Sequence, residues 1–250
     1  MKTDLQLIEE RHPLVHNITN YVAMNMVANS LLAIGASPIM ARSPREVEEI
    51  AANCDALALN LGTLEVDSAQ AMILAGKSAF QHHKPIVFDP VGVGATAFRR
   101  NSADIIIKTC HPTVIKGNAA EIMALYTHQI GNTSIDSSVE TGKVESIAKQ
   151  VANNLSCVIV VSGSKDIITD GTQTAYVTEG HSLMARVTAM GCTATGIIGA
   201  FLAINPDSFD AALHAMQAMG LAGKRAGVVS RGNGSMMINF LDELSNLQNG

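Results

Sequence analysis

The sequence has no tryptophan, few aromatic residues and few charges for its length. Of its 250 residues, 4% are aromatic and 16% are charged, whereas 47% are hydrophobic. No basic run with interleaved aromatic residues occurs and the net charge is -5, so we expect no nucleic-acid partner. A chain of this size and apolar content can bury one sizeable core. We therefore predict a single α/β domain over residues 1–250.

Cysteine pairs, metal-binding histidine pairs and long apolar runs are also missing. The four cysteines never form a CxxC motif, which favours reduced thiols over a disulfide framework or a zinc site. The eight histidines show no HxxxH spacing, which disfavours a transition-metal site. Acidic residues lie within the first ten positions, and no apolar run approaches the length of a membrane span. We therefore expect a cytoplasmic protein without a membrane partner.

Short apolar segments alternate with helical patterns along most of the chain. The predicted strands are residues 14–18, 38–41, 56–60, 85–89, 113–116 and 157–161. This alternation predicts a mostly parallel sheet with right-handed crossover helices, in which ligands bind at the carboxyl ends of the strands. Residues 166–169 and 172–177 flank Asp170-Gly171, a favoured hairpin turn, so the sheet should end in antiparallel edge strands.

Several local patterns give finer predictions. Capping boxes are predicted at residues 3–6, 43–46 and 137–140. Residues 185–189 resemble a strand. Two helices have predicted buried faces, one formed by Val66, Ala69, Ile73, Gly76 and Phe80, and the other by Met237, Phe240, Leu241 and Leu244.

The segment 185–204 suggests an anion site. Met190-Gly191-Cys192-Thr193 forms a turn into a helix, and the first amides of a helix lack internal partners. A phosphate could therefore bind the amides of residues 191–194. The small residues Gly191, Thr193 and Ala194 would allow it to approach the backbone and form the anion hole. The helix dipole would favour the thiolate of Cys192, which could act as a base or as a polar contact for a hydroxyl. Alternatively, Cys192 is only a small buried apolar residue.

Two carboxylates follow predicted strands. Asp89 precedes a glycine-rich turn and could contact magnesium or phosphate, or could form a structural turn. Residues 92–97 match GxGxxA, but no acidic residue ends a strand about 20 positions later, which disfavours a dinucleotide site. Glu121 follows Gly117-Asn118 in the first turn of a predicted helix. It could bind hydrated Mg²⁺ or simply face the helix dipole.

Five segments together resemble hydroxyethylthiazole kinases, a family of thiamine-salvage enzymes with the ribokinase-like fold. They are HNITNYVAMNMVAN at 16–29, GASPIMA at 35–41, DPVGVGA at 89–95, GNAAE at 117–121 and VTAMGCTATG at 187–196. The resemblance covers nearly the whole chain. It implies a three-layer α-β-α domain that transfers the γ-phosphoryl group of ATP to the hydroxyl of 4-methyl-5-(2-hydroxyethyl)thiazole with Mg²⁺. It also implies a homotrimer with active sites between subunits.

The resemblance assigns roles residue by residue. Cys192 stands where related kinases have a catalytic aspartate. The chemistry of phosphoryl transfer agrees with this, since Mg²⁺ near Asp89 and Glu121 would offset the charge of the triphosphate. The remaining positions are Met40, Ala189 and Asn25 on the thiazole side, and Lys116 and Ser162 on the ATP side. Lys116 replaces an expected arginine and Ser162 an expected threonine. Lysine keeps the charge but loses the bidentate fork of arginine.

Three other functions stay open at this point. A related kinase could act on hydroxymethylpyrimidine or pyridoxal. An ADP-dependent hydratase of the same fold should have an acidic residue at the position of Cys192, which disfavours that function here. A non-catalytic ligand-binding module would need no anion site facing an acidic pair.

Overall fold

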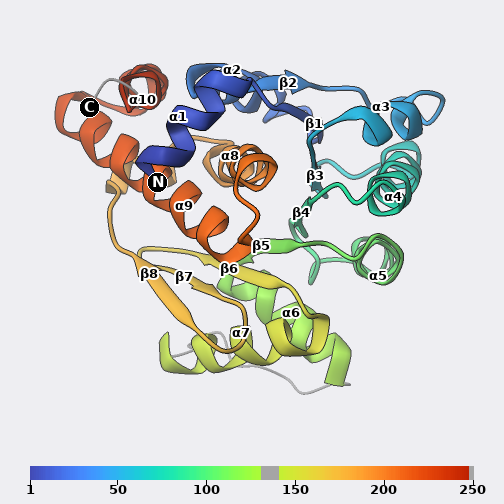
Figure 1. The fold of residues 1–250 in the computed structure, drawn as a ribbon. Helices are drawn as coiled ribbons and strands as arrows, with labels where there is room; N and C mark the ends of the chain where they lie inside the picture. Colours follow the sequence, from blue (N-terminus) through green and yellow to red (C-terminus); the bar gives the residue numbers. More distant parts are fainter. Residues whose placement is uncertain (131–140, 248–250) are drawn as a thin grey trace.

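The computed structural model describes residues 1–130 and 141–247 and has three layers, a central sheet between two layers of helices (Figure 1). The strands are β1 Leu14–Ile18, β2 Ser37–Ile39, β3 Ala56–Asn60, β4 Ile86–Asp89, β5 Val114–Asn118, β6 Val158–Ser162, β7 Asp166–Thr169 and β8 Thr174–Val177. The helices are α1 Lys2–Arg11, α2 Met24–Ala33, α3 Val47–Asn53, α4 Val66–Gln81, α5 Ala97–Cys110, α6 Ala119–Ile130, α7 Thr141–Leu155, α8 Met190–Ile204, α9 Ser208–Val229 and α10 Asn233–Asn246, with a 3-10 helix at Ser182–Arg186.

The sheet has the order β2-β1-β3-β4-β5-β6-β7-β8. Strands β1 to β6 form only parallel pairs with one another, whereas the β6–β7 and β7–β8 pairs are antiparallel. The predicted parallel sheet with antiparallel edge strands is therefore confirmed. Because β2 and β3 lie on opposite sides of β1, the strand order reverses at β1, and ligands of such sheets bind outside the carboxyl ends of strands near the reversal.

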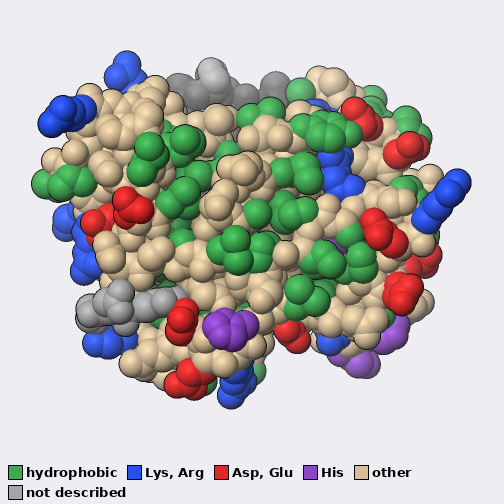
Figure 2. All heavy atoms as spheres, turned by 90° about the horizontal axis from the view of Figure 1, so that it is seen from above, with side chains coloured by type: hydrophobic (Ala, Val, Ile, Leu, Met, Phe, Trp, Pro, Cys, Tyr) green, Lys and Arg blue, Asp and Glu red, His purple; other side chains and the backbone are tan. Residues whose placement is uncertain are grey.

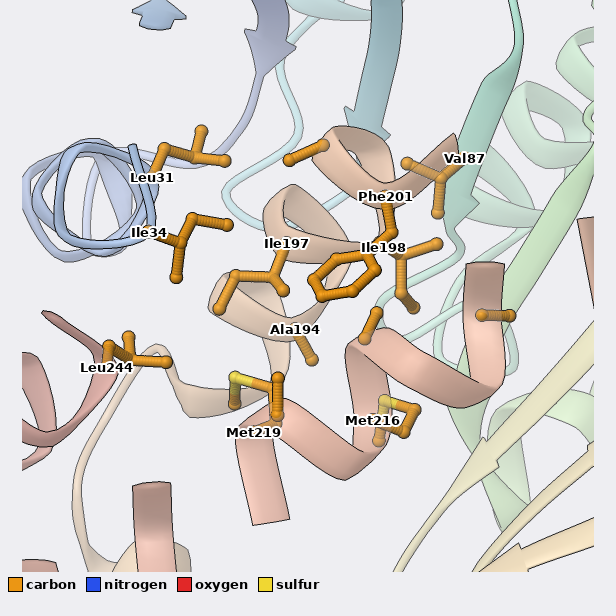
Figure 3. Packing of buried hydrophobic residues seen from close by; sticks show 14 of the residues in the cluster. Leu31, Ile34, Val87, Ala194, Ile197, Ile198, Phe201, Met216, Met219 and Leu244 are labelled. Carbon is orange, nitrogen blue, oxygen red and sulfur yellow. The ribbon is translucent and has the colours of Figure 1, made fainter. Parts of the chain in front are cut away.

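Two hydrophobic clusters hold the layers together. One lies between the sheet and helices α1, α2, α8, α9 and α10, and the other lies between the sheet and α3 to α7. Helix α8 is at the centre of the first cluster. Figure 3 shows its Ala194, Ile197, Ile198 and Phe201 among side chains from α2, α9 and β4. The helix that begins at the predicted anion site is thus anchored on all sides.

Glycine allows α8 to approach the sheet and α2. A Cβ atom on Gly196 would lie 2.8 Å from Val27 Cγ1 and 3.3 Å from Asn17 Oδ1. We predict that Gly196→Ala destabilises the protein by about 1–3 kcal/mol, because an added methyl group must displace packed atoms. The measurement is thermal unfolding, with a fall of roughly 2–4 °C per kcal/mol at this chain length.

Gly234→Ala in α10 is the matched control for this substitution. Nothing lies within 4 Å of a Cβ atom at Gly234, so the control should gain stability from the helix propensity of alanine. Equal melting temperatures for Gly196→Ala and the parent protein would contradict the close packing of α8.

Two of the predicted helix faces are partly wrong. Val66 and Phe80 are 71% and 48% exposed, because α4 buries a row of smaller residues that includes Ala71, Ala75 and Ala79. Met237 is 42% exposed, whereas Met236 is fully buried with Phe240 and Leu244. Residues 236, 240 and 244 are spaced by four and lie on one face of α10. The buried face therefore contains Met236 in place of the predicted Met237.

The segment before α8 is not the predicted strand. Residues Ser182–Arg186 form a 3-10 helix that contacts α9 and α10 instead of pairing with the sheet. Gly223 and Gly227 of α9 leave room for Met184 and His181, whose atoms lie where Cβ atoms of these glycines would be. The apolar residues of this segment therefore face helices and not a neighbouring strand.

The capping boxes had mixed outcomes. Helix α1 begins after Met1 and α3 after Glu46, and neither residue caps through its side chain. The predicted capping boxes at residues 3–6 and 43–46 are therefore wrong. The third, at Ser137–Glu140, lies outside the described residues. No helix in the described ranges is long and apolar enough to cross a membrane.

Candidate active site

Polar side chains gather where the parallel strands end. Asn60 closes β3 and is paired in register with Asp89, which closes β4. Asn118 and Ser162 are paired in the same way at the ends of β5 and β6. Because these strands run in one direction, their last residues meet at one edge of the sheet, beside the first turn of α8.

Asp89 is the centre of a buried network. Its Oδ2 accepts hydrogen bonds from Asn60 Nδ2 at 3.0 Å, Thr195 Oγ1 at 2.8 Å and Lys116 Nζ at 3.4 Å. Its Oδ1 is buried without a hydrogen-bond partner. Burial raises the pKa of the Asp89 carboxyl, and the nearby Lys116 ammonium acts in the opposite direction. Asp89 therefore has a free oxygen atom that suits a cation.

Cys192 lies beside this network, in the first turn of α8. Asn20 Nδ2 is 3.1 Å and Asn60 Nδ2 is 3.3 Å from its Sγ. The sequence did not predict a contact of Asn20 or Asn60 with Cys192, although Asn20 follows β1 and Asn60 ends β3. Their positions at strand ends were the signal that could have found them.

The thiol is not activated as the sequence suggested. Burial raises the pKa of Cys192 and the nearby Asp89 carboxylate raises it further, while hydrogen bonds from Asn20 and Asn60 act in the opposite direction. The prediction that the thiolate of Cys192 is favoured is therefore wrong, because burial of the sulfur disfavours its charged form.

The free amides of α8 lie slightly earlier than predicted. The helix has Ala189 as its N-cap, and the Thr193 amide donates to Ala189 O at 2.8 Å. An α-helix therefore leaves the amides of Met190, Gly191 and Cys192 without internal partners. Thr193 is fully buried with an unpartnered Oγ1, and Ala194 lies one residue further into the helix. Of the four amides predicted to bind phosphate, those of Gly191 and Cys192 are therefore available, whereas those of Thr193 and Ala194 are not.

Glu121 ties two loops together. Its Oε1 accepts from the Gly92 amide at 2.9 Å and its Oε2 accepts from the Asn118 amide at 2.8 Å. The Asn118 side chain in turn accepts from the Glu121 amide at 3.0 Å. Glu121 thus fixes the turn after β4 beside the start of α6. It also raises the pKa of Asp89, so the two carboxylates lie close enough to interact.

The predicted ATP-binding residues line one cavity. This cavity, of about 720 Å³, includes Lys116, Ser162, Gly191 and Ala194 in its wall. Lys116 is 4% exposed, and its Nζ donates to Gly191 O at 3.1 Å. The cavity also contains Asp166, which was not identified from the sequence. Burial raises the pKa of the Asp166 carboxyl to about 6.

The three predicted thiazole-side residues have different environments. Met40 is half-buried after β2 and packs against the first hydrophobic cluster. Ala189 has φ 71°, a left-handed conformation that is uncommon for alanine, directly before the first turn of α8. Asn25 is exposed on α2, and its Oδ1 accepts from Asn29. Asn20, not Asn25, lies beside Cys192.

The donor set fits Mg²⁺. Mg²⁺ typically binds one or two carboxylates together with phosphate oxygens and water. Asp89 Oδ1 is a buried carboxylate oxygen without a partner, and Glu121 lies nearby. The residues present are therefore consistent with the predicted metal site.

The chain is similar to known proteins over nearly its whole length. A family model described as hydroxyethylthiazole kinase family matches residues 5–250. A hydroxyethylthiazole kinase of Desulfotalea psychrophila is 44% identical over 244 residues, which cover 98% of this chain and 89% of that protein.

Two solved structures extend this similarity to the fold. A hydroxyethylthiazole kinase protein from Pyrococcus horikoshii OT3 has a TM-score of 0.91 and 36% identity, and covers 98% of this chain and 92% of that chain. A ribokinase-like superfamily protein from Enterococcus faecalis V583 has a TM-score of 0.65 and 14% identity, with 100% and 90% coverage, and shows the fold alone. The family predicted from five sequence segments is thereby confirmed, and the chain belongs to the hydroxyethylthiazole kinase family.

Proposed function

We propose that this protein transfers the γ-phosphoryl group of ATP to the hydroxyl of 4-methyl-5-(2-hydroxyethyl)thiazole, as part of thiamine salvage. The observation that carries the proposal is the position of Asp89, Lys116 and Cys192 around the first turn of α8. Family membership supports the same activity. The whole chain acts as one kinase domain, and its four free cysteines support a reducing compartment such as the cytoplasm.

The roles of the residues follow from phosphoryl transfer chemistry. This reaction depends mainly on positioning and on neutralising charge. The free amides of Gly191 and Cys192 face the transferred group, and Lys116 and Ser162 bind the phosphates of ATP in the cavity. Cys192 contacts the hydroxyl of the alcohol. Met40, Ala189 and Asn25 are assigned to the thiazole side of the site.

Asp89 and Glu121 hold Mg²⁺ in this proposal. The ion supplies positive charge that offsets the negative charge of the triphosphate. The unpartnered Oδ1 of Asp89 and the carboxylate of Glu121 would hold the ion. Lys116 adds a second positive charge on the other side of Asp89.

A homotrimer with sites between subunits belongs to the same proposal. Figure 2 shows hydrophobic side chains gathered on the face that carries α2 and α10 at the top of Figure 1. The exposed large hydrophobic residues of α2, α10, the end of α9 and the turn before α2 are Tyr21, Val22, Leu32, Val228, Val229, Met237 and Ile238. Monomers rarely expose so many large apolar side chains on adjacent elements, so contact with further copies is favoured.

One assay tests the function. ADP release is measured by a coupled reaction with ATP and Mg²⁺, in the presence and absence of hydroxyethylthiazole. We expect release that depends on the thiazole alcohol and is slower with hydroxymethylpyrimidine or pyridoxal. Faster turnover of either alternative would assign the protein to a related kinase. Equal release with no alcohol would contradict a kinase for any of the three.

Removing the thiol should slow the chemical step only moderately. We predict that Cys192→Ala lowers kcat by about tenfold, because one hydrogen-bonded contact with the alcohol is lost. The KM for ATP should not change, because Lys116 and Ser162 line a cavity that does not include Cys192. Steady-state kinetics with both substrates varied makes the distinction. Unchanged turnover would remove Cys192 from the mechanism.

A further inference from the structure

The side-chain amide of Asn60 has one possible orientation. The Gly62 amide donates to its Oδ1 at 2.9 Å, and a backbone N–H cannot donate to an NH₂ group. Its Nδ2 lies 3.0 Å from Asp89 Oδ2, an acceptor. Both contacts require the oxygen of Asn60 to face Gly62 and its NH₂ group to face Asp89 and Cys192.

The amide of Asn20 is oriented in the same way. The Ala23 amide donates to Asn20 Oδ1 at 3.0 Å, and Asn20 Nδ2 donates to Asn60 Oδ1 at 2.9 Å. The NH₂ group of Asn20 therefore also faces Cys192. Asn20 and Asn60 are 6% and 2% exposed, so water does not compete for these bonds.

Both N–H donors meet at one sulfur atom. The distances to Cys192 Sγ are 3.1 Å from Asn20 Nδ2 and 3.3 Å from Asn60 Nδ2. A thiol sulfur is a weak acceptor with two lone pairs, which is enough for these two donors. The group that Cys192 has left for a further contact is its S–H. The charged groups near the sulfur are Asp89 and Lys116.

We propose that Asn20 and Asn60 are positioning residues that hold the Cys192 sulfur as a double acceptor, so that its S–H donates to the hydroxyl oxygen of the substrate. This inference rests on the proposed function and deepens it. It assigns Cys192 an orienting contact and not the removal of the hydroxyl proton. It also assigns Asn20 and Asn60 a role that acts through Cys192, in addition to their local backbone contacts.

A double-mutant cycle on kcat tests this coupling. Asn20→Ser keeps an oxygen that can accept from the Ala23 amide, since serine caps helices as well as asparagine does, but its side chain is too short to reach Cys192. We expect Asn20→Ser to lower kcat about fivefold, as expected for the loss of one hydrogen bond. In the Cys192→Ala background the same substitution should have no further effect. Equal losses in both backgrounds would overturn the proposal.

Two controls accompany the cycle. Asn53→Ser changes an exposed asparagine of α3 and should leave kcat unchanged. Melting temperatures of all variants identify any loss of folding. Asn20→Ala, which also loses the bond from the Ala23 amide, should show a lower melting temperature than Asn20→Ser, so the two roles of Asn20 can be measured separately.

Infrared spectroscopy observes the S–H group directly. The difference between the spectra of the parent protein and Cys192→Ala isolates the S–H stretching band of Cys192. We expect hydroxyethylthiazole, without ATP, to move this band to lower wavenumber, because the S–H bond weakens when it donates. An unmoved band in protein shown by calorimetry to be saturated with the alcohol would overturn the proposal.

The spectrum also separates this inference from the proposed function. Asn20→Ser should shift the Cys192 band in protein without any ligand, because the sulfur then loses one donor. If the parent protein releases no ADP with the alcohol, the proposed function fails, and the band of the unliganded protein still tests the hydrogen bonds to sulfur. An identical band in Asn20→Ser and the parent would show that Asn20 does not act on Cys192.

Discussion

Asp89→Asn is expected to lower kcat/KM for the thiazole alcohol by about 10²–10³-fold, the loss typical of removing one group that stabilises transferred charge. The substitution has a defined geometric consequence. Asn60, Lys116 and Thr195 all donate to Asp89 Oδ2, so the amide oxygen of an asparagine must face them. Its NH₂ group then replaces the unpartnered Oδ1 and turns an acceptor into a donor that cannot bind a cation.

The substitution has two opposing effects on the fold. Burial raises the pKa of Asp89, so a neutral amide avoids the cost of burying an ionised carboxylate. The same substitution leaves the buried Lys116 ammonium without its counter-ion, which is destabilising. The melting temperatures of the variant and the parent protein are therefore compared. Loss of activity without loss of stability would place the effect at the metal site.

Steady-state kinetics at several Mg²⁺ concentrations provides the measurement. The variant should need more Mg²⁺ for half-maximal rate than the parent protein. Asp242→Asn removes the same charge from the exposed face of α10 and should behave as the parent does. If Asp89→Asn kept the parent rate and Mg²⁺ dependence, Asp89 would not be a metal ligand.

The sequence predicts the architecture well because the strands have continuous apolar runs between helical patterns. All six predicted strands from 14–18 to 157–161 have ends within two residues of the observed ones, as do the two hairpin strands around Asp170-Gly171. The errors occur where tertiary contacts override a local pattern. The segment before α8 alternates apolar and polar residues, but Met184 and His181 pack into the space left by two glycines of α9.

The sequence predicts only those residues of the candidate site that a local pattern marks. Asp89 and Lys116 were identified because each ends a strand or belongs to a family motif, and the structure brings them together. Asn20 and Asn60 are 40 positions apart and each looks like an ordinary turn residue, so only the fold shows that they meet at Cys192. The pKa of Cys192 was predicted with the wrong sign, because burial of the thiol cannot be read from a helix start.

Lys116→Met should raise the KM for ATP by about 10–100-fold, since a hydrogen bond to a charged group contributes about 1.5–3 kcal/mol. Lys116 is 4% exposed at the wall of the cavity, so methionine can fill its space without its charge. The buried Asp89 carboxyl would also lose its cationic partner, which should raise the pKa of Asp89 further and weaken the metal site.

Lys116→Arg separates charge from shape in the same experiment. Arginine keeps the positive charge and can bind a phosphate with two parallel hydrogen bonds, so the KM for ATP should stay within about tenfold of the parent value. The space is limited, because a Cβ atom on Gly191 would already lie 3.0 Å from Lys116 Nζ. Lys149→Met removes a partly exposed lysine of α7 that pairs with Glu145 and should leave the KM unchanged. An unchanged KM for ATP in Lys116→Met would remove Lys116 from the nucleotide site and leave it as the buried partner of Asp89.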